Sequence, residues 1–226
     1  MTVIFVIATI IFFLTLDWVS RRMKARKAVV VPAGHAVPAY PVRVPEGIFF
    51  TKSHTWLNLF PSGKVRIGVD DFVGRMVENP QIILLKKNGE AISRGEPVLT
   101  MKEDEHLLTV RSPIDGDIES INEELVRHPE LLKDLLFSDG WAYTIKPRKF
   151  SEIKGLLLGS ETREWMRGEF ARLRDFFAGV GQNGAIAPAL LQDGGPPMAG
   201  IMKTMDDAVW QNFEHEFLTI DESERA

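Results

Sequence analysis

The chain has 226 residues, enough for one domain of ordinary size with appended segments, and 45% of them are hydrophobic, enough to build a core. A formal net charge of -4 is too mild to indicate nucleic-acid binding, and no nucleic-acid partner is expected. The absence of cysteine excludes disulfides, thiolate metal sites and thiol nucleophiles.

Residues 1–20 are expected to form a transmembrane helix. Residues 2–16 are an uninterrupted run of apolar residues and threonine, and Trp18 then marks a membrane interface. About 18 helical residues span ~27 Å, just enough to cross the hydrocarbon core of a bilayer. A cleaved signal peptide is the alternative, but it requires positive charge before the apolar run and a small-residue cleavage site after it. Here the charge follows the run.

Residues 21–46 are expected to be a basic flank followed by a proline-rich tether. Five Lys and Arg residues lie between positions 21 and 27, and they predict that this side of the membrane is the cytoplasm. Pro32, Pro38, Pro41 and Pro45 are typical of an extended tether. The predicted location is therefore the inner (cytoplasmic) membrane, crossed once by residues 2–19, with the remaining chain in the cytoplasm.

A compact domain is expected over residues 47–178. Alternating apolar residues predict strands over 54–59 and 64–69, joined by a turn at 61–63. Short apolar runs predict further strands over 82–85, 117–121 and 141–145, and a helical stretch over 122–136 is interrupted at Pro129. Many short strands separated by Gly- and Pro-containing turns predict a mainly β fold, a flattened β-barrel or sandwich.

Residues 95–116 predict the hairpin around which this domain is organised. Two apolar strands flank a charged turn, and four charged residues cannot be buried without partners, so the turn is expected to project into water. Glu103, Asp104, Glu105 and His106 are expected to offer an acidic tip to a basic groove on a partner. Glu105 and His106 could form an acid–base pair, but an exposed turn lacks the desolvation that tunes such a pair. No catalytic residue is expected.

The sequence predicts helices on the C-terminal side of the domain. Residues 151–158 and 160–177 are expected to be helical, and the aromatic stripe of the second is expected to cover the barrel, with binding to a membrane surface as the alternative. Residues 179–200 read as a flexible linker. Residues 201–226 predict an acidic amphipathic helix whose Trp210, Phe213 and Phe217 dock either on this domain or on a partner protein.

No metal site is expected, because no two of the five histidines have metal-ligand spacing. His54, beside Trp56 on the first strand, is expected to be a structural hydrogen-bonding residue near the hairpin.

Residues 47 to about 170 resemble the H protein of the glycine cleavage system, a lipoyl-carrier domain of the barrel-sandwich hybrid type. The resemblance rests on the order and spacing of landmarks: His54-Thr55-Trp56, Ile67 to Phe72, Gly89, Gly95-Glu96, Ser112 to Gly116, Asn122, Leu125, Pro129 to Leu131, Gly140-Trp141 and Lys146. In that family a lysine at the hairpin tip is acylated by lipoic acid. Counting from Gly95 or from Ser112 places Glu105 at this position.

The resemblance therefore implies two functions. In the first, the domain carries no cofactor and acts as a binding or assembly subunit of a membrane-associated protein complex. In the second, it is a lipoyl carrier that uses Lys102, the nearest amine, in glycine cleavage or related one-carbon metabolism. The first is favoured because a carboxylate cannot form the amide to lipoate. Lys102 also lies three residues earlier, an odd shift that turns a strand side chain to the opposite face.

Overall fold

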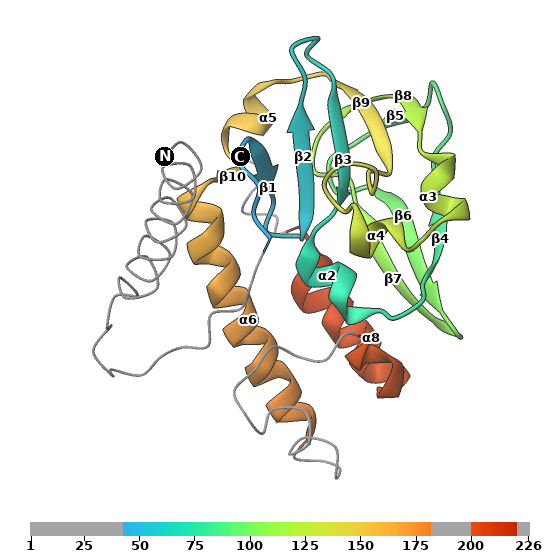
Figure 1. Cartoon of the computed structure of the whole chain (residues 1–226), viewed down its shortest axis with the longest axis vertical. Coiled ribbons are helices and arrows are strands. Elements are labelled where there is room, and N and C mark those ends of the chain that lie inside the picture. The colour runs from blue at the N-terminus through green and yellow to red at the C-terminus, as the bar shows by residue number, and fades with distance from the viewer. Residues whose placement is uncertain (1–42, 182–199, 221–226) are drawn as a thin grey trace, which may run out of the picture. The chain divides into compact units, whose positions relative to one another are not determined.

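The computed structural model describes residues 43–181 and 200–220, shown in colour in Figure 1. The expected membrane helix over 1–20, the tether up to residue 42, residues 182–199 of the expected linker and the last six residues of the tail lie outside the described residues. The linker was expected to begin at residue 179, but residues 179–181 are helical. Among the described helices, none combines the length and the apolar character that crossing a bilayer would need.

The described strands form two antiparallel sheets. The strands are β1 (Ile48–Phe50), β2 (Thr55–Leu59), β3 (Val65–Val69), β4 (Gln81–Leu84), β5 (Ala91–Ile92), β6 (Pro97–Glu103), β7 (His106–Arg111), β8 (Gly116–Ile121), β9 (Tyr143–Pro147) and β10 (Leu157–Leu158). The larger sheet has the order β10-β1-β2-β3-β9-β8-β5, and the smaller has the order β4-β6-β7. The expected β domain with C-terminal helices is confirmed in this form.

The core of the domain depends on close approach between β2 and β3. Trp56 on β2 is fully buried and pairs across the sheet with Gly68 on β3. A Cβ atom at Gly68 would lie 2.8 Å from the Trp56 ring and 2.9 Å from the Gly140 carbonyl oxygen. Only glycine therefore fits opposite the indole.

Short helices connect the strands. They are α2 (Asp71–Met76), α3 (Glu123–Arg127), α4 (Leu131–Asp134) and α5 (Ser151–Lys154). Asp70 caps α2, because its carboxylate accepts hydrogen bonds from the N–H groups of Phe72 and Val73. The predicted interruption of the 122–136 helical stretch is confirmed, since α3 and α4 lie on either side of Pro129.

The expected helix over 151–158 is wrong in its second half. Only Ser151–Lys154 is helical, and β10 follows Gly155. Leu157 and Leu158 pair with Phe50 and Phe49 of β1, so the backbone hydrogen bonds of this segment go to an open sheet edge rather than to another helical turn.

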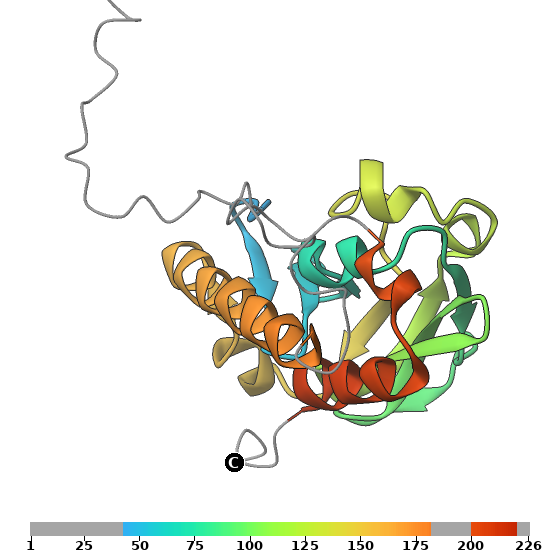
Figure 2. The ribbon, with the colours of Figure 1, turned by 90° about the horizontal axis from the view of Figure 1, so that it is seen from below.

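Helix α6 (Ser160–Gly181) lies against the β domain and the tail (Figure 2). Met166, Phe170, Leu173 and Phe177 on one face of it are buried. Phe170 contacts Phe72 of α2, with ring centroids 5.2 Å apart. The expectation that this apolar stripe covers the domain is therefore confirmed.

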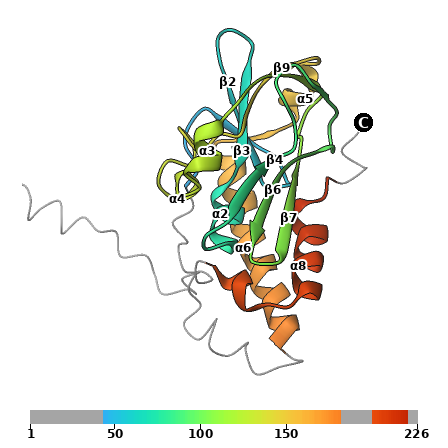
Figure 3. The same cartoon turned by 90° about the vertical axis from the view of Figure 1, so that its right-hand side faces the viewer.

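The sequence predicts one continuous helix in the tail, but the structure has three shorter helical segments there. It comprises a 3-10 turn, η1 (Ile201–Thr204), then α8 (Asp207–Phe213), then the π-helical turn η2 (Glu214–Leu218). Asp206 has extended backbone and accepts a hydrogen bond from the Val209 N–H, so it starts a new helix instead of continuing η1. Helix α8 lies beside β7 (Figure 3).

Candidate functional site

The β6–β7 hairpin ends in a two-residue turn. Glu103 and His106 form the last pair of the ladder, and Asp104 and Glu105 connect them, both exposed. Asp104 has a φ of 53°, a left-handed conformation that aspartate tolerates better than most side chains. The tip therefore presents two carboxylates to solvent.

Glu103 does not belong to the exposed tip, so its expected exposure is wrong. Its side chain is 4% exposed, and its carboxylate accepts hydrogen bonds from the backbone N–H groups of Glu78, at 3.0 Å, and Asn79, at 2.7 Å. Strand alternation places Glu103 on the same face as the buried Met101. The backbone N–H groups of Glu78 and Asn79, just after α2, supply the hydrogen bonds that a buried carboxylate requires.

Lys102 lies on the opposite face of β6. It pairs across the sheet with Gln81 of β4 and Leu107 of β7, and it is partly exposed. Its amine forms no hydrogen bond or ion pair with any residue that the structure describes. Lys102 thus lies three residues from Glu105, on a strand rather than in the turn, and its amine has no partner within the part of the chain that the structure describes.

His106 joins the hairpin to the tail. Its Nδ1 atom lies 2.8 Å from the Asp207 carboxylate, and its ring stacks on Trp210 with centroids 4.8 Å apart. The sequence placed His106 at the exposed tip, whereas the structure makes it a contact between β7 and α8.

The aromatic residues of the tail dock on this domain, one of the two alternatives that the sequence left open. Trp210, Phe213 and Phe217 are at most 2% exposed. Phe217 lies 5.3 Å from Phe72 of α2, and Phe213 lies 6.1 Å from Phe176 of α6, both between ring centroids. The described residues thus account for the burial of all three.

His54 sits in a buried charge network that sequence reasoning found only in part. Its ring is fully buried, with Nδ1 2.8 Å from the Asp70 carboxylate and Nε2 3.6 Å from that of Glu169. Its φ of 59° is left-handed. Burial alone would lower the pKa of His54, but the two carboxylates outweigh it and raise that pKa above its usual value.

Glu169 completes this network from α6. Its carboxylate accepts two hydrogen bonds of 2.8 Å from the Arg172 guanidinium. Burial raises the pKa of Glu169, but His54 and Arg172 together lower it below its usual value. A glutamate four residues after Trp165 in an apolar stripe was the signal in the sequence, because a carboxylate on a buried face requires a partner.

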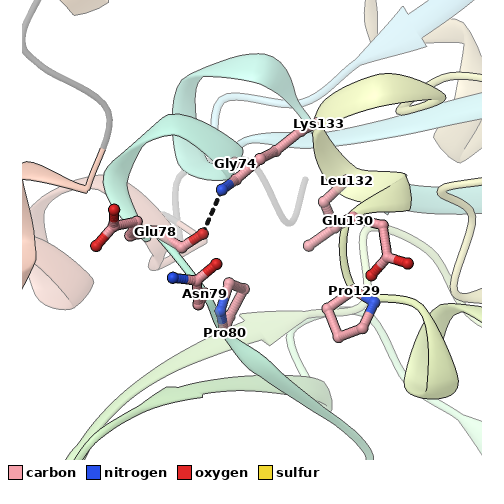
Figure 4. Close-up of a pocket in the computed structure, with 8 residues that line it drawn as sticks. All are labelled: Gly74, Glu78, Asn79, Pro80, Pro129, Glu130, Leu132 and Lys133. Carbon is pink, nitrogen blue, oxygen red and sulfur yellow. Dashed lines mark hydrogen bonds between the residues drawn. The ribbon is translucent and has the colours of Figure 1, made fainter.

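A pocket of about 230 Å³ lies between α2, the start of β4 and α4 (Figure 4). The Lys133 amine donates a hydrogen bond to the Glu78 carbonyl oxygen across one side of it. Pro80, Pro129 and Leu132 supply apolar walls. Within the ranges that the structure describes, no group of three His, Asp or Glu side chains could hold a metal ion.

The β domain thus presents the β6–β7 hairpin with an exposed two-residue tip. Residues 48–169 match the family described as glycine cleavage H-protein, and the chain belongs to this family. Members of this family are non-catalytic carrier proteins that work with other proteins of the glycine cleavage system. The expectation of a chain without catalytic activity of its own agrees with that family.

Curated relatives of the chain carry the same description. The chain is 26% identical over 125 residues to a glycine cleavage system H protein of Coprothermobacter proteolyticus, covering 55% of this chain and 98% of the relative. It is 28% identical over 114 residues to one of Chromobacterium violaceum, covering 50% and 89%. A crystal structure of an H protein from Mycobacterium marinum is similar at 24% identity and a TM-score of 0.46, covering 52% of this chain and 94% of that one.

Proposed function

We propose that this chain is a non-catalytic docking subunit of H-protein type that carries no lipoyl group. The observation behind this proposal is the hairpin tip, where Asp104 and Glu105 are the exposed residues. Attachment of lipoate requires a nucleophilic amine that forms an amide, and a carboxylate cannot supply one. The tip of the hairpin therefore offers negative charge instead of a covalent arm.

The chemistry of the tip favours a protein partner with a basic groove. Two exposed carboxylates at the end of a narrow hairpin attract Lys and Arg side chains and fix their register. Asp104 and Glu105 are the contact residues in this proposal. Glu103 stabilises the turn, because its carboxylate accepts hydrogen bonds from the backbone just after α2. The partner is a subunit of a membrane-associated complex.

A lipoyl carrier that uses Lys102 is the second candidate. Family membership favours it, because H proteins are carriers. Lys102 is partly exposed, and its amine has no ion-pair partner among the described residues. No described residue therefore blocks acylation of this amine. The position on a strand, three residues before Glu105, counts against it.

The mass of the full chain purified from its own cells distinguishes the two candidates. An unmodified mass supports the docking subunit. A lipoyl-sized increment that disappears in a Lys102→Arg variant overturns it in favour of the carrier. Affinity purification of the full chain from detergent extract, compared between the natural chain and a Glu105→Arg variant, then tests the acidic contact. Partners should be lost when the charge is reversed.

The proposal also includes a location for the chain at the membrane. Residues 2–19 anchor the chain in the inner membrane and the β domain lies on the cytoplasmic side, as the apolar run and its basic flank support. Alkaline extraction of membranes should leave the full chain in the pellet and release a variant lacking residues 2–19. Release of both would contradict the anchor.

A further inference from the structure

The tail packs against a surface formed by three elements of the domain, β7, α2 and α6. Figure 3 shows α8 of the tail beside β7, and Figure 2 shows the tail beside α6. Trp210 stacks on His106 of β7, Phe217 contacts Phe72 of α2, and Phe213 contacts Phe176 of α6. The three tail aromatics are at positions i, i+3 and i+7, which share one helical face. Phe213 and Phe217 each contact both Phe72 and Phe176, so they lie between α2 and α6, whereas Trp210 packs on β7. The domain therefore holds the amphipathic tail by three aromatic side chains.

Polar contacts fix the direction and register of the tail on this surface. Strand β7 is an edge of the smaller sheet, and the Thr109 N–H, which has no neighbouring strand to bind, donates to the Glu214 carboxylate at 2.9 Å. At the other end the Gly200 N–H donates to the Arg75 carbonyl oxygen at 2.8 Å. A carboxylate at position i+4 thus completes the recognition pattern.

The domain of the family ends before this tail begins. The family match stops at residue 169, and the Coprothermobacter relative is covered over 98% of its own length by an alignment of 125 residues. The β domain of such relatives is therefore complete without a counterpart of residues 200–220. The tail is therefore an addition to the family's fold. Its helix also continues into a π-helical turn, a feature often found at functional sites.

We propose that the surface formed by β7, α2 and α6 is a helix-binding site, and that segment 200–220 of this chain is its resident ligand. The class of ligand is an amphipathic helix with aromatic side chains at i, i+3 and i+7 and a carboxylate at i+4. The site takes up the tail as a reversible ligand, so a free helix of the same pattern competes with it. This inference does not depend on whether the hairpin carries a lipoyl group.

The test separates the tail from the domain after folding. A protease site is inserted between residues 188 and 189 of the full chain, the folded protein is cut, and a fluorescent peptide of residues 200–220 is added. The peptide should replace the cut tail, seen as a rise in anisotropy. The uncut chain should bind it about 100-fold more weakly, because a tethered tail competes at an effective concentration near the millimolar range.

Matched peptides test the recognition pattern. A peptide with Trp210→Ala and Phe217→Ala should lose binding by at least tenfold, and one with the exposed Gln211→Ala should bind as the natural peptide does. Three results would overturn the proposal: a cut tail that leaves only when the domain unfolds, a domain that unfolds once the tail leaves, or equal binding of the peptide to the cut and uncut chains.

Discussion

The imidazole of His106 and the indole of Trp210 lie face to face, with ring centroids 4.8 Å apart and planes 10° from parallel. His106 is the first residue of β7 after the hairpin turn, and Trp210 belongs to α8. The Trp210 indole N–H also donates to the Met202 carbonyl oxygen at 2.9 Å, so the same residue links the two helical parts of the tail. The tail thereby holds the strand that carries the tip.

Replacing Trp210 with alanine should loosen the tail without unfolding the sheets. Truncating a buried tryptophan costs ~3–5 kcal/mol. The Thr109 amide, which donates to Glu214 of the tail, should therefore exchange its hydrogen at least ~100-fold faster, since every 1.4 kcal/mol corresponds to about a factor of ten. Hydrogen exchange measured by NMR checks this, with Gln211→Ala as the control. Unchanged protection of Thr109 would contradict it.

Two neighbouring glutamates of the hairpin should differ sharply in their effect on stability. Glu103→Ala removes the acceptor of two backbone N–H groups from a buried position and should cost ~2–3 kcal/mol. Glu105→Ala, at the exposed turn, should change the free energy of unfolding by less than ~0.5 kcal/mol. Urea unfolding of the two variants measures both values. Equal losses would mean that Glu103 has no structural role of its own.

The buried His54 should make stability depend on pH. Its pKa is raised above 6.5 in the folded chain, because the carboxylates of Asp70 and Glu169 outweigh the effect of burial. A raised pKa contributes stability that is complete below pH 6.5 and is lost as the pH rises through the folded value. The free energy of unfolding should fall above pH 6.5 by ~1.4 kcal/mol per pH unit at most.

Glu169 sets the lower end of the pH range in which this buried network stabilises the fold. Its pKa lies below 4.5 in the folded chain, so its contribution is present above pH 4.5 and is lost as the pH falls through the folded value. The network should therefore be most stabilising between pH 4.5 and 6.5. Denaturation curves at several pH values test this. A His54→Asn variant, which tolerates the left-handed backbone, should lack the fall above pH 6.5.

Local patterns in the sequence were sufficient to predict the domain and its hairpin. Alternation placed Trp56 and Ile67 in paired strands, and Pro129 marked a helix break. Glu103 was misjudged because four charged residues in a row indicate an exposed turn. What reverses this expectation is a long-range contact: the N–H groups after α2 reach Glu103 across 25 positions of the sequence. A pattern within the hairpin carries no information about such a partner.

The tail illustrates the same limit. Its aromatic face was evident from the spacing of Trp210, Phe213 and Phe217, but the surface that receives it was not. That surface is assembled from His106, Phe72 and other residues that lie far apart in the chain. Amphipathicity predicts that a face will be buried and leaves its partner open. The buried pairing of His54 with Asp70 and Glu169 escaped for the same reason.

The hairpin backbone should accept a covalent arm if its tip is given an amine. Asp104 and Glu105 already form the two-residue turn of a closed ladder, and Glu105 stands where counting from Gly95 or Ser112 places the lysine of the family. A Glu105→Lys variant should therefore gain a lipoyl-sized mass increment with a lipoate ligase, lipoate and ATP. The natural chain should gain none.

The control for this last experiment tests whether modification requires a lysine at the hairpin tip or only an exposed lysine. Glu46→Lys also adds an exposed amine, but outside the hairpin, and it should stay unmodified. If an authentic H protein is modified in the same reaction and Glu105→Lys is not, the tip is closed to the ligase. Because the tail contacts His106 beside the turn, the same variant cut between residues 188 and 189 then shows whether the tail closes it. Modification of the natural chain would instead place the acceptor elsewhere and favour Lys102.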